Sequence, residues 1–165
     1  MLVPVGIALG SNLGNRQEEL DAGIEFLRML AHDHKVLKGP RVETEPVNCP
    51  PGSPPFLNSV AEIIVESMEL PPLNLFGSLE DFEIERGRSP IREINSPRPL
   101  DLDIIYYGDY EYDQMGLIIP HRRAHQRRFV LEPLAAIRPD LILPGQTRSV
   151  KQLLADLAQV SAVSR

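Results

Sequence analysis

The chain has 165 residues, of which 42% are hydrophobic, a single cysteine and a formal net charge of −6. This length predicts one domain, residues 1–165, and no stretch approaches the roughly twenty apolar residues of a membrane-spanning helix. The acidic balance argues against nucleic acid or anionic membrane as a partner, and one thiol excludes an intrachain disulfide and a cysteine-based zinc site, so we expect a soluble cytoplasmic protein.

The N-terminal segment predicts a strand followed by a helix. Apolar residues 3–9 indicate a buried strand, which ends in the glycine-containing turn 10–14. Asn15 followed by Glu18 has the spacing of a capping box and marks a helix start. This helix should bury an apolar stripe made of Leu20, Ile24, Leu27 and Ala31.

The next residues predict two strands on either side of a long loop. Residues 35–44 are compatible with a second strand, and the β-branched residues within 58–66 indicate a third. Between these strands, the prolines of residues 46–55 oppose regular structure and stiffen the connection.

A second helix and a fourth strand follow. Pro71 and Pro72 suit the first turn of the helix, which should end at Gly87. Residues 88–99 form a loop rich in arginine and proline, and residues 100–107 predict the fourth strand.

The order strand, helix, strand, strand, helix, strand predicts an α+β fold. Its core should be ferredoxin-like, βαββαβ, with helices on one face of an antiparallel sheet. The expected C-terminal additions are a strand at 116–120, a helix at 123–137 that is interrupted near Pro133, and a last helix capped by Ser149 and Gln152.

Basic residues are unevenly placed along the chain. No lysine occurs between Lys38 and Lys151, so that segment uses arginine alone. The planar guanidinium group matches phosphate oxygens better than an ammonium group does, which favours a polyphosphate ligand; a solvated basic surface is the alternative. The arginines between residues 86 and 128 are Arg86, Arg88, Arg92, Arg98, Arg122, Arg123, Arg127 and Arg128.

The segment 97–105, Pro-Arg-Pro-Leu-Asp-Leu-Asp-Ile-Ile, carries the clearest chemistry. Alternate side chains of a strand share a face, so Asp101 and Asp103 should point the same way and Leu102 the opposite way. Adjacent carboxylates repel unless a cation lies between them, and Mg²⁺ is commonly held by one or two carboxylates together with substrate phosphates. The pair therefore predicts a magnesium and phosphate site, against the alternative of two ordinary surface aspartates.

Several motifs, taken in order, resemble the 6-hydroxymethyl-7,8-dihydropterin pyrophosphokinases of folate biosynthesis. They are Ala-Leu-Gly-Ser-Asn-Leu-Gly at 8–14, Thr-Glu-Pro at 44–46, Phe-Leu-Asn at 56–58, Gly-Arg at 87–88, the segment 97–104, Pro-His at 120–121, Arg127, Phe-Val-Leu at 129–131 and Pro-Leu at 133–134. The resemblance implies a ferredoxin-like enzyme that depends on ATP and magnesium. It transfers the β,γ-diphosphate of ATP to the hydroxymethyl group of the reduced pterin, leaves AMP, and is a monomer or weak homodimer.

The resemblance also implies roles for individual residues. Asp101 and Asp103 resemble the ligands of two Mg²⁺ ions that clamp the triphosphate, and Arg88 and Arg98 resemble catalytic arginines that close onto the phosphates. The further ATP contacts that it implies are Glu80, Glu83, Ile104, His121 and Arg127.

For the pterin, the resemblance implies that Phe56 and Phe129 sandwich the flat ring system by stacking. Asn58 is expected to pair with the amide-like edge of the ring. Further hydrogen bonds are expected from Thr44, Glu45 and Val47.

The chain departs from the family pattern at three positions. Many relatives have tryptophan where this chain has Asn95, some place another loop arginine at the position of Pro90, and Arg122 stands where tyrosine or proline is usual. These differences concern loop closure and nucleotide contacts and leave the aspartate pair unchanged.

Two other classes of protein are alternatives. An RNA-recognition module has the same order of elements, but it needs aromatic residues on the central strands and a basic surface. A ferredoxin-like regulatory module would bind ATP or a pterin without catalysis. Magnesium-dependent formation of AMP separates that module from the enzyme.

Overall fold

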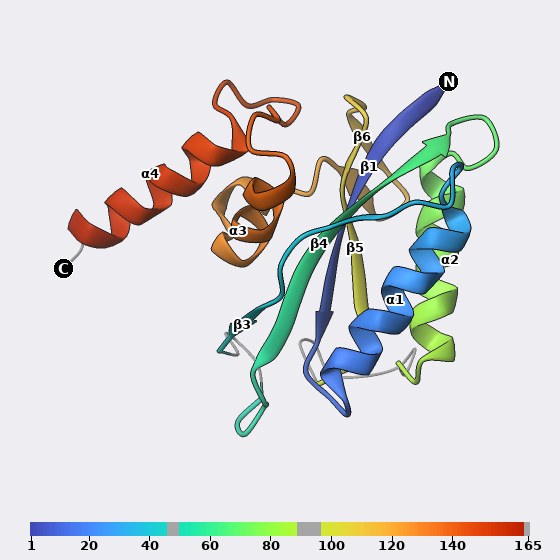
Figure 1. Ribbon diagram of the computed structural model, residues 1–165, viewed down its shortest axis with the longest axis horizontal. Helices are drawn as coiled ribbons and strands as arrows, with labels where there is room; N and C mark the ends of the chain where they lie inside the picture. Colours follow the sequence, from blue (N-terminus) through green and yellow to red (C-terminus); the bar gives the residue numbers. More distant parts are fainter. Residues whose placement is uncertain (46–49, 89–96, 164–165) are drawn as a thin grey trace.

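The computed structural model describes residues 1–45, 50–88 and 97–163. Within these residues, five strands form one antiparallel sheet with helices on both faces (Figure 1). The strand order is β2-β4-β1-β5, and β3 also pairs with β4. The strands are β1 (Leu2–Ser11), β2 (Leu37–Lys38), β3 (Val42–Thr44), β4 (Phe56–Glu66) and β5 (Asp101–Tyr107).

Helices α1 (Arg16–Leu30) and α2 (Pro72–Glu85) cover one face of this sheet. Asn15 caps α1 as predicted, because its side-chain oxygen accepts a hydrogen bond from the Glu18 backbone N–H at 3.1 Å. Just beyond α2, Gly87 adopts φ +108°, a backbone conformation that favours glycine and ends the helix.

The main apolar core lies between the sheet and these two helices. Alternation along β1 buries Val5, Ile7 and Leu9 in this core, and alternation along β5 adds Leu102 and Ile104. The side chains between them point to the opposite face of the sheet. Because alternate side chains of β5 face the core, only those between them can contact a ligand on the opposite face of the sheet.

Small residues on the other face of β1 make room for a second apolar layer. A Cβ at Gly6 would lie 2.3 Å from a ring carbon of Tyr106, so only glycine fits beneath this buried ring. A β-bulge where β1 pairs with β5 shifts the alternation, and both Ile105 and Tyr106 consequently lie in this second layer.

Helices α3 (Arg128–Ile137) and α4 (Val150–Val163) complete the second layer. A buried polar cluster ties α3 to the sheet: the Tyr106 hydroxyl donates to Glu62 Oε2, and Arg138 Nη1 lies 2.5 Å from the same oxygen. Since Arg138 is the C-cap residue of α3, the cluster holds the C-terminal end of that helix against the sheet.

The strand predicted at 35–44 is instead divided into β2 and β3. Pro40 lies between the two strands and has no N–H to donate to β4. The Gly39 N–H donates to the Val60 carbonyl at 2.8 Å, and the Ser59 hydroxyl lies 3.0 and 3.1 Å from the carbonyl oxygens of Gly39 and Pro40. The Ser59 side chain thus replaces the backbone hydrogen bonds that would otherwise join this segment to β4.

The helix predicted at 123–137 is interrupted at Arg127, and the expectation of a break near Pro133 was wrong. A 3₁₀ turn, η1 (Ala124–Gln126), precedes extended backbone at Arg127, and α3 then runs through Pro133. Pro133 costs α3 only the one hydrogen bond that its missing N–H would have made to Phe129.

The last predicted elements are present with one addition. The expected strand at 116–120 is β7 (Leu117–Ile119), which pairs with β6 (Tyr112–Gln114), a strand that the sequence analysis missed. Ser149 and Gln152 cap α4 as predicted: the Ser149 N–H donates to Gln152 Oε1 at 2.8 Å, and the Gln152 N–H donates to Ser149 Oγ at 3.2 Å.

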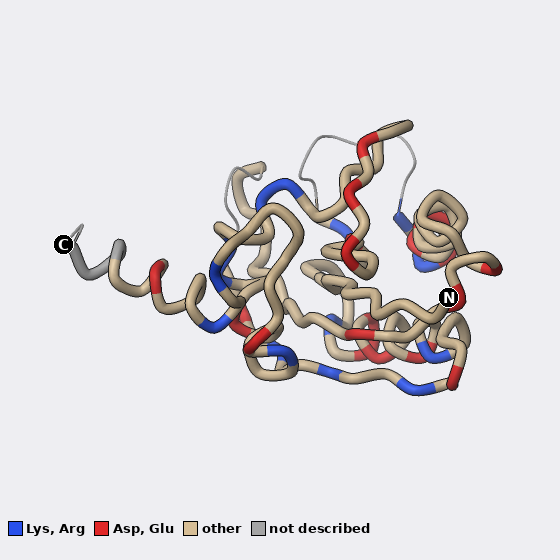
Figure 2. Tube along the Cα trace, turned by 90° about the horizontal axis from the view of Figure 1, so that it is seen from above, with Lys and Arg blue, Asp and Glu red and all other residues tan. Residues whose placement is uncertain are grey.

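The distribution of charge and the length of the helices bear on nucleic acid and membrane as partners. Figure 2 shows Lys and Arg positions interspersed with Asp and Glu positions around the described trace, unlike the basic face of an RNA-recognition module. Every helix of the described residues falls short of the length and apolarity that crossing a membrane requires.

Candidate active site

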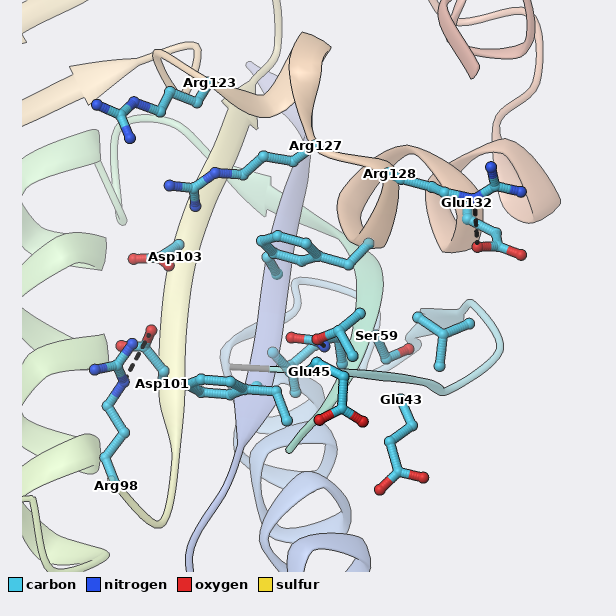
Figure 3. Close-up of a pocket in the computed structure, with 18 residues that line it drawn as sticks. Glu43, Glu45, Ser59, Arg98, Asp101, Asp103, Arg123, Arg127, Arg128 and Glu132 are labelled. Carbon is cyan, nitrogen blue, oxygen red and sulfur yellow. Dashed lines mark hydrogen bonds and ion pairs between the residues drawn. The ribbon is translucent and has the colours of Figure 1, made fainter. Parts of the chain in front are cut away.

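A pocket of about 790 Å³ opens on the sheet face that carries α3. Its wall combines the end of β1, β3, the first residues of β4 and β5, and the segment 123–132 (Figure 3). This volume suits a small-molecule substrate. Segments from both halves of the chain therefore meet in one cavity.

Asp101 and Asp103 line this pocket from the start of β5, whereas Leu102 is buried in the core on the other face. The prediction that the two carboxylates share one face of the strand is confirmed. Figure 3 shows both on the same side of β5, with Arg98 beside Asp101 and Arg127 beside Asp103.

Two arginines contact Asp101. Arg88 Nη1 donates to Asp101 Oδ1 at 3.1 Å, and Arg98 Nε lies 3.4 Å from Asp101 Oδ2. The Arg98 backbone N–H also donates to Asn12 Oδ1 at 2.9 Å, which holds the entry to β5 against the turn after β1. Both expected catalytic arginines therefore lie beside the aspartate pair.

Asp103 is held in an environment that opposes its negative charge. Burial, reinforced by the charge of Asp101, raises the pKa of Asp103 to about 7, although Arg98, Arg127 and Arg88 act in the opposite direction. A carboxylate in this position gains strongly from a nearby cation.

Glu83 lies beneath the pocket on α2 and is only 3% exposed. Its Oε2 accepts a hydrogen bond from the Leu102 backbone N–H at 2.9 Å and one from Arg88 Nη1 at 2.5 Å. Burial and the charge of Asp101 raise the pKa of Glu83 to about 8, and the Leu102 N–H and Arg88 oppose this shift. Glu83 thus supports Arg88 from below and does not line the cavity.

Replacing Glu83 by glutamine is expected to change how stability depends on pH in the metal-free protein. Because the folded-state pKa of Glu83 is raised above its ordinary value of 4.5, the native state retains this proton, and wild-type stability falls as pH rises through about 8. Glutamine has no proton to lose. Between pH 6 and pH 9 the variant should gain at least about 3 °C in Tm relative to wild type, the shift that roughly 1 kcal/mol produces at this size.

Thermal unfolding of both proteins across that pH range is the measurement. Glu80→Gln is the matched control, because Glu80 is an exposed carboxylate on the same helix and should leave the pH profile unchanged. If the Tm of the wild type and the Tm of Glu83→Gln changed in parallel over this pH range, the raised pKa assigned to Glu83 would be contradicted.

The other half of the pocket is aromatic. Phe56 and Phe129 both line it, from the start of β4 and the first turn of α3. The Arg98 guanidinium carbon lies 5.2 Å from the centroid of the Phe56 ring, and that of Arg127 lies 5.5 Å from the Phe129 ring. Each ring therefore adjoins an arginine of the charged half.

Polar side chains from β3 and β4 add hydrogen-bonding groups to the wall of the same pocket. Asn58 is 7% exposed, and its Nδ2 donates to Thr44 Oγ1 at 2.8 Å. At Gly10 a Cβ would lie 3.3 Å from Asn58 Oδ1 and 3.6 Å from Phe56 Cδ1, so glycine leaves this part of the pocket open. Glu45 also lines the pocket, and Val47 lies outside the described residues.

Ile104 and Glu80, two further expected ATP contacts, are like Glu83 not part of the pocket wall. Ile104 is 4% exposed and packs in the core under α1 and α2, because alternation along β5 turns it away from Asp103. The Ile104 side chain therefore faces away from the pocket, as the strand alternation predicted, and a contact of this residue with ATP stays a prediction. Glu80 is exposed on α2 and is not part of the pocket wall. Pro90 and Asn95, two of the departures, lie outside the described residues.

His121 lies next to the pocket wall and is partly buried. Its backbone N–H donates to the Ile105 carbonyl at 2.8 Å, and its Nδ1 accepts the Arg123 backbone N–H at 3.1 Å. Burial, followed by the charges of Arg127 and Arg123, lowers the pKa of His121. The neutral ring then carries its proton on Nε2, which makes that atom a hydrogen-bond donor.

Sequence reasoning missed part of the pocket wall. Strand alternation would have placed Ala8 and Gly10 on the face opposite to Leu9, and the arginine-only segment contained Arg123 and Arg128 without giving them a role. The other residues that it missed are Leu9, Val42, Glu43, Ser59 and Glu132.

The donor atoms of the pocket fit magnesium. Asp101 and Asp103 offer carboxylate oxygens, and the described residues contain no group of three or more His, Cys, Asp or Glu side chains that could hold a metal ion. Two carboxylates leave positions for water and for substrate oxygens, which is how Mg²⁺ usually binds.

Paired carboxylates on a helix-backed sheet, facing several guanidinium groups across a pocket, define the class of enzymes that act on phosphorylated substrates through divalent cations. Residues 6–139 match the family model described as 7,8-dihydro-6-hydroxymethylpterin-pyrophosphokinase. The chain therefore belongs to the 7,8-dihydro-6-hydroxymethylpterin-pyrophosphokinase family.

Individual relatives agree with this assignment. The chain is 38% identical over 154 residues to the 2-amino-4-hydroxy-6-hydroxymethyldihydropteridine pyrophosphokinase of Haemophilus influenzae. The aligned region covers 92% of this chain and 93% of that protein. It is 37% identical over 156 residues to the protein of the same name from Pseudomonas aeruginosa, with coverage of 94% and 92%.

Solved structures share the fold at much lower identity. The crystal structure of a Plasmodium falciparum HPPK-DHPS triple mutant with pteroate superposes with a TM-score of 0.78 at 11% identity. The match covers 99% of this chain and 45% of that chain. The present chain therefore corresponds to less than half of the length of that protein.

Proposed function

We propose that this chain transfers the β,γ-diphosphate of ATP to the hydroxymethyl group of 6-hydroxymethyl-7,8-dihydropterin, a step of folate biosynthesis. The observation that carries the proposal is the meeting of Asp101 and Asp103, several arginines and two phenylalanines in one pocket. A metal and phosphate site thereby adjoins a site for a flat polar heterocycle. Diphosphate transfer requires this arrangement, because the phosphate chain of ATP and the hydroxymethyl group of the pterin must meet.

In the proposed reaction the hydroxymethyl oxygen attacks the β-phosphorus, the bond from that phosphorus to the α-phosphate oxygen breaks, and AMP leaves. Two magnesium ions held by Asp101 and Asp103 would neutralise the phosphate oxygens when bound. Arg88 and Arg98 contact Asp101, which supports a role for their guanidinium groups in binding the phosphate chain beside the metal site. Arg127 and the Nε2–H of His121 are further donors to phosphate oxygens.

The aromatic half of the pocket is proposed to bind the pterin. Phe56 and Phe129 stack on the ring system, and Asn58, Thr44 and Glu45 offer hydrogen bonds to its edge. A ligand that lacks these donors and acceptors would leave buried polar groups unpaired, so the pocket should discriminate between pterins and apolar rings of similar size.

The fold can also be classified further. The strand order β2-β4-β1-β5, with β2 and β3 together taken as one interrupted strand, supports a ferredoxin-like core with α3 and α4 as additions. We propose that residues 1–165 act as one domain, as a monomer or weak homodimer.

The direct test is to incubate the protein with ATP, Mg²⁺ and 6-hydroxymethyl-7,8-dihydropterin and to identify the products chromatographically. AMP and the pterin diphosphate are expected in equal amounts, and neither should appear when Mg²⁺ or the pterin is omitted. ADP in place of AMP would rule out diphosphate transfer. Binding of ATP and the pterin without any AMP would support the regulatory module instead.

Removal of the Phe129 ring should weaken pterin binding selectively. Phe129→Ala is expected to raise the Kd for the pterin about tenfold to a hundredfold, because one stacking surface and its buried area are lost. The Kd for ATP should change by less than about threefold, since Arg127 loses only its contact with the ring. Isothermal titration with each ligand measures both values.

Phe82→Leu is the matched control. Phe82 stacks on Phe26 at a centroid distance of 4.2 Å between α1 and α2, outside the pocket. Its replacement should lower stability and leave both Kd values near wild type. Equal weakening of pterin binding in the two variants would show that Phe129 acts through stability.

A further inference from the structure

Arg123 is a pocket residue for which the family resemblance implies no role. It lines the same cavity as Arg127 and Asp103. Figure 3 shows the guanidinium groups of Arg123 and Arg127 one beyond the other on the Asp103 side of the pocket, with Arg98 at the opposite end beside Asp101. The aspartate pair thus lies between guanidinium groups on both sides.

The backbone of Arg123 is held firmly. Its N–H donates to His121 Nδ1 at 3.1 Å, and its carbonyl accepts the Gln126 N–H at 3.0 Å. The next residue, Ala124, is fully buried in the second apolar layer. Because the backbone is held at the cavity, a ligand bound by Arg123 needs to order only the side chain.

Arg123 makes no ion pair with a carboxylate within 4.0 Å in the part of the chain that the structure describes. Arg88, Arg98 and Arg128 each lie within 4.0 Å of a carboxylate. No such ion pair of the described residues involves Arg123 or Arg127. Like charges directed into one cavity repel each other, and an anion between them relieves the repulsion.

We propose that Arg123, together with Arg127, binds the phosphate chain of the nucleotide at the end remote from Arg98. The proposal deepens the proposed function and rests on it, because it takes the ligand beside Asp103 to be the magnesium nucleotide. Arginine is suited to the task, since its planar fork can donate two hydrogen bonds to one phosphate group.

The test compares Arg123→Ala with Arg122→Ala. Arg122 is the adjacent arginine and one of the three departures from the family pattern. It is exposed like Arg123, but it is not part of the pocket wall, so Arg122→Ala controls for the loss of one positive charge nearby. The probes are α,β-methylene-ATP with Mg²⁺ and inorganic pyrophosphate with Mg²⁺, both measured by isothermal titration. Neither probe requires turnover.

Arg123→Ala should weaken the binding of both probes about tenfold to a hundredfold, the effect of one charge-assisted hydrogen bond or two. Arg122→Ala should change them by about twofold or less. The Kd for the pterin should stay at the wild-type value in both variants. Arg123→Lys, which keeps the charge without the fork, should bind both probes with intermediate strength.

Unchanged probe affinities in Arg123→Ala would overturn the proposal, and so would equal weakening in Arg122→Ala, which would indicate a diffuse basic surface. The two proposals fail in different ways. If the wild type forms no AMP but Arg123→Ala loses pyrophosphate binding, the phosphate contact stands and the reaction is wrong. If AMP forms and Arg123→Ala binds both probes normally, the reaction stands and the contact is wrong.

Discussion

Asp103→Asn is expected to lower kcat by at least about a thousandfold while the protein remains folded, and Asp101→Asn should do the same. Each substitution keeps the size of the side chain and removes a carboxylate charge that divalent cations need, and stabilisation of transferred phosphoryl oxygens by a bound metal amounts to several kcal/mol. Asp103→Asn should not lower stability in the absence of metal. Burial raises the pKa of Asp103, so its ionisation opposes folding and the neutral amide avoids that cost.

Three measurements separate this result from its alternatives: turnover, thermal unfolding without ligand, and the increase in Tm that Mg²⁺ with α,β-methylene-ATP produces. The last should be present in wild type and largely absent in both variants, because ligand stabilisation follows affinity. Asp109→Asn, an exposed aspartate in the turn after β5, is the control and should behave as wild type. Loss of the cooperative unfolding transition in either pocket variant would assign it a structural role.

Arg98→Ala is expected to lower kcat about a hundredfold or more while the Kd for ATP changes less than about fivefold, as for a contact made mainly in the transition state. Arg98 is a counter-ion to Asp101, with its Nε 3.4 Å from Asp101 Oδ2, and its guanidinium group lies against the Phe56 ring. Its removal leaves Asp101 more available to a cation. Mg²⁺ affinity should therefore stay equal or rise although turnover falls.

Arg86→Ala is the matched control for this experiment. Arg86 makes two hydrogen bonds to the Glu19 carboxylate, at 2.9 and 3.0 Å, and joins α2 to α1 outside the pocket. Its loss should lower stability and leave kcat within about twofold of wild type. Steady-state kinetics with direct titration of ATP and Mg²⁺ tests both variants. An Arg98→Ala enzyme with unchanged kcat and weaker ATP binding would show that Arg98 serves binding alone.

The elements with a strong local pattern were predictable. The caps of α1 and α4 follow from Asn15 and from the Ser149 and Gln152 pair, whose hydrogen bonds involve residues three positions apart. The period of two along β5 predicted the shared face of Asp101 and Asp103 because side-chain direction in a strand depends only on the local backbone.

Boundaries that depend on distant partners were not predictable. The division at Pro40 is stable because Ser59 of the neighbouring strand supplies hydrogen bonds. The path of α3 through Pro133, with the break displaced to Arg127, accompanies the contact of Arg138 with Glu62. In each case the local conformation is accompanied by contacts with residues far along the chain, which local spacing does not reveal.

The sequence by itself determined the chemistry of this protein: the paired carboxylates, the arginine-only segment, the two phenylalanines and the order of elements all follow from residue types and spacing. Only the tertiary structure decided which of these residues share a cavity. It brought Arg123 and Arg128 to the pocket wall. The physical reason is that spacing along the chain sets the direction of a side chain within its own element, whereas the distance between elements depends on how the sheet, its bulge and the docked α3 pack together.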